Sequence, residues 1–282
     1  MKKVLSYINL RLVLNFFLIM MLLVSCKNAP KSKDKKASNI NNKELNVKQE
    51  ITDNISQLIL SLPSSFEVTE MLNNNGISYM IGATNELDFV SRYFTSKSKA
   101  FNIGVYGSDL SYVSTYRMTQ ETMLYLKVIN QLGNDLGISS IYNENLLNRI
   151  QDNLNNKDTL VEVLTSTLFD TYDFLNKNGK GDLSVLMATG GYVEGLYLVT
   201  NSSSIAGGNP ALNKIIFKQE NTLEKLLEIL ESKKDNADFS ELIEDLKPVK
   251  NIYDEVQNET MTAAQVHNMA LAIEKIRNKL IS

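Results

Sequence analysis

The sequence has one cysteine, one histidine and no tryptophan among its 282 residues. A single cysteine excludes an intramolecular disulfide, a multi-cysteine zinc site and an iron–sulfur cluster held by several thiolates of one chain. A single histidine, His267, excludes the paired histidine ligands of a di-iron bundle and leaves one candidate base for a histidine-dependent triad. We therefore expect no metal and no cofactor.

Acidic residues are missing from the first part of the chain and are in excess in the rest. Residues 1–25 contain none, and residues 26–43 contain six lysines against Asp34 alone. The remainder, 44–282, carries 31 acidic against 20 basic residues. Because an acidic body repels a phosphate backbone, we expect no nucleic-acid partner.

The N-terminus has the charge and hydropathy pattern of a signal peptide. Basic residues at positions 2, 3 and 11 precede an apolar run over 12–24, which is shorter than the roughly 20 residues that span a bilayer. The run ends Leu23-Val24-Ser25-Cys26, which resembles the lipobox of bacterial lipoprotein precursors. That resemblance implies that the Cys26 thiol accepts a diacylglyceryl group and that cleavage before Cys26 frees an amine for acylation. A plain signal anchor with an incidental cysteine is the alternative.

We accordingly predict three segments: a signal peptide over 1–25, the lipidated Cys26 with a disordered lysine-rich tether over 26–45, and a folded domain over 46–282. Several acyl chains would hold the protein permanently in a lipid bilayer. Lys27 is not the aspartate that marks retention at the inner membrane, so we expect the outer membrane. With no acidic stretch after Cys26, we expect the protein to face the periplasm.

From about Val47 the sequence shows helical periodicity almost throughout. Residues 46–62 and 119–136 carry apolar residues at helical spacing, and Pro63 and Gly137 follow as stop signals. Capping patterns are Thr159 with Glu162, Asn209 before Pro210, Asp238 with Glu241, and Thr262 with Gln265. Residues 77–81 form the one short strand candidate. The sequence predicts an all-α, multi-helix bundle.

A faint internal repeat involves two acidic motifs. Asp109-x-x-Tyr112-x-x-Thr115 recurs 85 residues later as Glu194-x-x-Tyr197-x-x-Thr200, and each precedes a helix that opens with Gln-Glu. A duplicated helix pair and chance similarity both explain matches this short.

These two carboxylates are the candidate functional residues. Asp109 shares its helix face, within 98–116, with Tyr106 and Tyr112, and Glu194 lies between Gly190 and Tyr197. We expect Gly104 and Gly107 to let another backbone approach. The carboxylates could line a polar pocket for a cationic or hydroxylated ligand, or act as an acid/base pair. Alternatively, tyrosine hydroxyls or an arginine satisfy them inside the bundle and fix the helix register. For Asp109 the donors would be hydroxyls, the backbone or a cation such as Arg117 or Arg92.

The segments 100–112, 120–123 and 190–197 resemble a group of all-helical bacterial lipoproteins with no assigned activity, a resemblance that implies fold class and location only. Because we find no complete catalytic motif, we assign no catalytic residue and expect a non-enzymatic binding or scaffolding module. Its partner would be an envelope protein or a small ligand. The alternative is a hydrolase or lyase that acts on envelope glycans through carboxylates such as Asp109 and Glu194.

Overall fold

The computed structural model describes residues 65–205 and 209–282, all of which belong to one compact unit, Ile51–Ser282. Every regular element in these residues is a helix, and none of them forms a strand. The prediction of an all-α, multi-helix fold is thereby confirmed. The signal peptide, Cys26, the tether and the helix expected over 46–62 lie outside the described residues.

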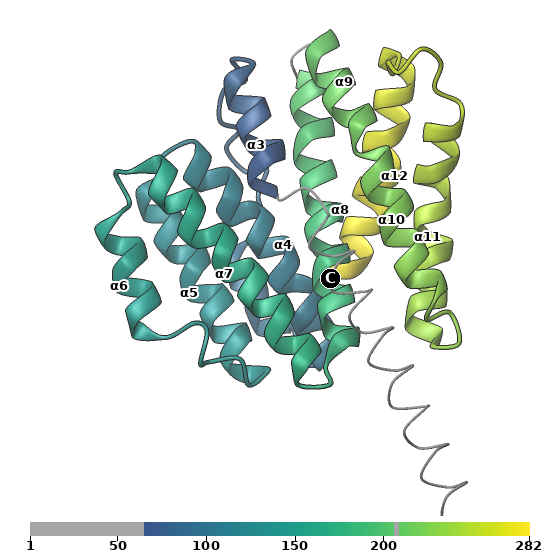
Figure 1. The fold of residues 1–282 in the computed structure, drawn as a ribbon. Helices are drawn as coiled ribbons and strands as arrows, with labels where there is room; N and C mark the ends of the chain where they lie inside the picture. Colours follow the sequence, from purple (N-terminus) through teal and green to yellow (C-terminus); the bar gives the residue numbers. More distant parts are fainter. Residues whose placement is uncertain (1–64, 206–208) are drawn as a thin grey trace, which may run out of the picture. The chain divides into compact units, whose positions relative to one another are not determined.

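Two long helices, α4 (Ser96–Thr115) and α8 (Gly181–Ile205), lie side by side at the centre of the fold (Figure 1). Nearly every residue of α4 from Ala100 onward is buried, including polar residues. A helix buried on all sides needs small or apolar side chains on every face, as both sequences have. Residues 181–203 of α8 are long and apolar enough to cross a membrane, but 83% of an 18-residue window within them is buried inside the protein, so this helix belongs to the core.

The remaining helices cover these two from opposite sides (Figure 1). Next to α4 lie α3 (Ser65–Asn74), α5 (Thr119–Asp135) and α7 (Lys157–Lys177), with α6 (Glu144–Asp152) packed on α7. Next to α8 lie α9 (Pro210–Lys218), α10 (Glu220–Glu231) and α12 (Ala263–Ile281), with α11 (Ala237–Asp254) packed on α10 and α12. A short 3₁₀ helix, η1 (Leu87–Arg92), precedes α4.

Asparagine caps decide where several of these helices begin. The predicted caps Asn209 and Thr262 are confirmed, the latter in a capping box with Gln265. The predicted starts at Thr159 and Asp238 are wrong, because Asn156 and Asn236 cap α7 and α11 one turn or less earlier. Asparagine ranks among the strongest N-cap residues, so each helix begins at the asparagine rather than at Thr159 or Asp238, which follow it in the sequence.

The strand predicted over 77–81 does not form. Residues 77–86, which we call the strap, follow α3 as irregular chain and lie along α4. Gly76 before it and Gly82 within it have φ angles of 73° and 80°, a region that glycine adopts without strain. Without a neighbouring strand, the backbone groups of the strap bind side chains of the helices instead.

Candidate functional site

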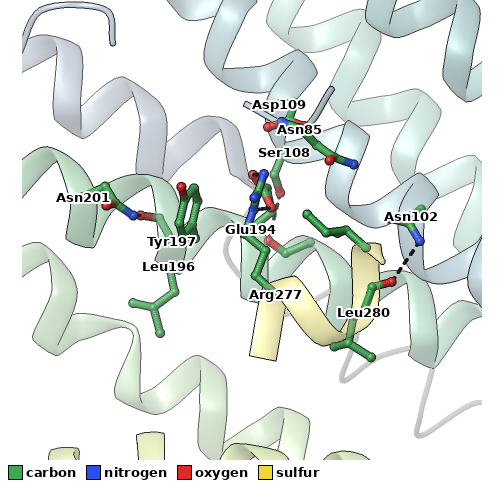
Figure 2. A network of polar contacts seen from close by, with 12 residues as sticks. Asn85, Asn102, Ser108, Asp109, Glu194, Leu196, Tyr197, Asn201, Arg277 and Leu280 are labelled. Carbon is green, nitrogen blue, oxygen red and sulfur yellow. Dashed lines mark hydrogen bonds and ion pairs between the residues drawn. The ribbon is translucent and has the colours of Figure 1, made fainter. Parts of the chain in front are cut away.

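The backbones of α4 and α8 touch where the two helices cross. A Cβ atom added to Gly104 would lie 1.9 Å from the carbonyl oxygen of Met187, and one added to Gly190 would lie 2.0 Å from that of Phe101. The contacts are reciprocal, since each glycine faces the residue three positions before the other. The predicted close approach is confirmed at Gly104 but wrong at Gly107, where a Cβ would meet nothing within 4 Å. As a result, the following turns of the two helices, which carry Asp109 in α4 and Glu194 in α8, lie next to each other (Figure 2).

Glu194 of α8 and Arg277 of α12 form a buried ion pair with two hydrogen bonds (Figure 2). Arg277 donates from Nε to Glu194 Oε2 at 2.6 Å and from Nη2 to Oε1 at 3.0 Å. Glu194 has no exposed surface, and Arg277 is 7% exposed. The guanidinium carbon also lies 4.2 Å from the centroid of the Tyr197 ring, a cation–π contact. The two-point pair fixes the orientation of α12 against α8.

Asp109 of α4 is fully buried next to this pair (Figure 2). Its Oδ2 accepts a hydrogen bond from the backbone N–H of Asn85 in the strap at 3.0 Å. Its Oδ1 has no hydrogen-bond partner in the described part of the chain. A buried carboxylate oxygen without a partner is costly, so the surroundings of Asp109 disfavour its ionised form.

Burial and charge act differently on the two carboxyl groups. Burial raises the pKa of Asp109 well above its ordinary value, and the negative charge of Glu194 raises it further. Burial also raises the pKa of Glu194, but the charge and the hydrogen bonds of Arg277 oppose that effect. The site therefore favours the protonated form of Asp109 more than that of Glu194, which Arg277 binds directly.

The tyrosines expected to satisfy Asp109 bind the strap instead. Tyr106 donates from Oη to the carbonyl oxygen of Glu86, and Tyr112 Oη accepts from the N–H of Met80, both at 2.8 Å. Burial is the largest cause that raises the pKa of both hydroxyls, so they stay protonated. Of the donors expected for Asp109, which were tyrosine hydroxyls, the backbone or an arginine, the structure shows the backbone.

The cation that compensates the carboxylates is also different from those expected. Arg277 takes this position, whereas Arg92 stacks on the ring of Phe89, 3.6 Å from its centroid. A sequence signal for Arg277 does exist, because it falls one turn after Ile273 on the buried stripe of α12. The contribution of Asn85 comes from its backbone N–H, which no side-chain pattern could reveal.

Asp109, Glu194 and Arg277 line none of the following cavities between described residues. One of about 1050 Å³ lies on the outer face of α5 beside α6 and is lined by Met123, Leu124 and Leu147, among others. A second of about 340 Å³ lies where the start of α4 meets α11 and α12. The third, about 30 Å³, lies in the core between α4, α5 and α7.

The buried carboxyl pair thus has no open path to a substrate in this structure. A general acid or base must reach the proton it transfers, directly or through one water. No group of three or more potential metal-ligating side chains is found within the described ranges. What the arrangement does is connect three helices and the strap around a buried ion pair and a second buried carboxyl group.

Scans against protein-family models, curated proteins and solved structures find no match to this chain.

Proposed function

We propose that the chain is a lipid-anchored protein of the bacterial cell envelope that works as a non-enzymatic binding or scaffolding module. The anchor would be Cys26, because the only cysteine of the chain stands directly after a signal-peptide pattern. The all-helical body would then be held at the outer membrane, on the periplasmic side, by a lysine-rich tether.

The burial of Asp109 and Glu194 is the observation that supports a non-enzymatic role. Hydrolysis of a glycan by two carboxyl groups needs them about 5–10 Å apart on either side of an open cleft. Here both have no exposed surface, and Glu194 is occupied by two hydrogen bonds from Arg277. This arrangement supports the interpretation of a structural network over that of an acid/base pair.

Lipidation is tested by replacing the anchoring thiol. We expect the wild-type chain to incorporate labelled palmitate and to stay with membranes after an alkaline wash, because acyl chains resist extraction that releases peripheral proteins. Cys26→Ala should abolish both properties. A Cys26→Ala chain that still reaches mature mass and stays in the washed membranes would contradict the lipobox interpretation.

Catalysis is tested with purified peptidoglycan. We expect the wild-type protein to release no soluble fragments from it. If the wild type does release fragments, and folded Asp109→Asn and Glu194→Gln variants do not, the alternative of a carboxylate-based glycan hydrolase or lyase is correct.

A further inference from the structure

The strap is held to the bundle by side chains that bind its backbone. Tyr116 donates from Oη to the carbonyl oxygen of Ile77 at 2.7 Å, and Tyr125 donates to that of Asn85 at 2.8 Å. With the three bonds described above, five side chains contact five backbone groups of this segment. We call this set the tyrosine face: Tyr106, Asp109, Tyr112 and Tyr116 of α4, and Tyr125 of α5. Because every peptide carries the same backbone groups, such a surface suits an extended polypeptide of varied sequence.

Only some strap side chains turn toward the bundle. The ring of Tyr79 stacks on Tyr112 with centroids 5.2 Å apart and tilts against Tyr116 at 5.7 Å. Asn85 is also buried, whereas Ile81 is 94% exposed. The tyrosine face therefore accommodates an aromatic ring at one position, and Asn85 at another donates from Nδ2 to Tyr93 Oη at 3.2 Å.

The strap has little internal structure to hold it in place. Its internal backbone hydrogen bond, from the N–H of Ala83 to the carbonyl oxygen of Met80, is 3.4 Å long. The helices around it keep full hydrogen-bond ladders and most of the buried apolar surface. A segment without a hydrogen-bond ladder of its own opens at a lower free energy than the helices it covers.

We propose that the tyrosine face is a peptide-binding groove that the strap occupies in the free protein. A partner protein would displace the strap with an extended segment that carries an aromatic side chain at the position of Tyr79. This inference rests on the proposed binding function and specifies its partner. The strap then acts as an internal competitor, which lowers the apparent affinity for the partner by the fraction of time that the groove is empty.

The test is binding of the strap sequence added as a separate molecule. The probe is a fluorescein-labelled peptide of residues 76–87, and its anisotropy is measured with the full chain in detergent. Tyr79→Ala loosens the strap without changing the groove, and we expect it to bind the peptide about ten-fold tighter than the wild type. Ile81→Ala is the matched control in the strap and should bind like the wild type. Adding Tyr116→Phe to Tyr79→Ala removes a groove donor and should weaken binding.

Equal affinities of the wild-type and Tyr79→Ala chains, or binding that Tyr116→Phe leaves unchanged, would overturn the proposal. If Tyr79→Ala fails to fold, hydrogen exchange of the wild type decides. The amides of Met80 and Asn85 should then exchange at least about ten-fold faster than amides in the middle of α4, and equal protection would overturn the proposal. A negative peptide-binding result would leave the palmitate-labelling and peptidoglycan experiments unaffected. Those two experiments therefore test the proposed function independently of the peptide-binding groove.

Discussion

Replacing each buried carboxyl group by its amide distinguishes the two members of the pair. Glu194→Gln keeps the shape of the side chain but leaves Arg277 buried without a counterion, since both atoms that accept its hydrogen bonds belong to Glu194. Loss of one partner of a buried ion pair costs about 3–5 kcal/mol. For a chain of this size, 1 kcal/mol corresponds to about 2–4 °C, so we expect the melting temperature to fall by about 6–20 °C.

Asp109→Asn should behave differently, because an amide resembles the protonated carboxyl group. Its oxygen can accept the N–H of Asn85, and an amide places no second negative charge beside Glu194. We therefore expect the free energy of unfolding to stay within about 1 kcal/mol of the wild-type value. Asp109→Ala provides neither atom and should cost more than Asp109→Asn.

Thermal denaturation of the purified full chain at pH 7, followed by circular dichroism at 222 nm, measures all three variants. The reasoning is refuted if Asp109→Asn destabilises as much as Glu194→Gln, because Asp109 would then be the ionised member. It is also refuted if Glu194→Gln melts at the wild-type temperature.

Three further predictions concern the same core. The free energy of unfolding of the wild type, relative to that of Asp109→Asn, should fall as pH rises from about 4. The reason is that the pKa of Asp109 is higher in the folded than in the unfolded chain, so the folded chain holds the extra proton. Urea denaturation at stepped pH measures this difference, and parallel pH profiles of the two proteins would contradict it. Gly104→Ala should destabilise the protein strongly, because its Cβ would lie 1.9 Å from a backbone oxygen of α8. Gly107→Ala is the control, since its Cβ would meet open space, and it should be neutral or stabilising by up to about 1 kcal/mol. Equal melting temperatures of the two variants would be evidence against the close crossing of α4 and α8. Arg277→Lys keeps the charge but loses the two-point contact, so we expect a loss of about 1–3 kcal/mol in urea denaturation, and a lysine variant as stable as the wild type would show that the pairing geometry is unimportant.

The sequence was sufficient to predict the class of fold and the position of the polar core within it. Helical periodicity and the caps at Asn209 and Thr262 depend on residues within one or two turns of each other, which a local pattern contains. The composition around Asp109 and Glu194, small and aromatic rather than charged, also indicated burial correctly.

The partners of these carboxylates could not be predicted in the same way. Glu194 and Arg277 are 83 residues apart, and their meeting depends on how α12 packs on α8. The donor to Asp109 is a backbone N–H, which every residue but proline has. Helix starts at Asn156 and Asn236 were missed because several capping residues stand close together and compete for the same helix.

The distance along the chain between Glu194 and Arg277 also has a consequence for the order of folding. The central helix α8 contains a carboxylate that acquires its counterion only when the last helix has been made and has docked. An intermediate that contains α4 and α8 but lacks α12 would have to keep Glu194 hydrated or protonated, either of which opposes closure of the core. The final packing of α8 must therefore wait until α12 has docked, so removal of α12 should leave a collapsed chain without a fixed core rather than a smaller native protein.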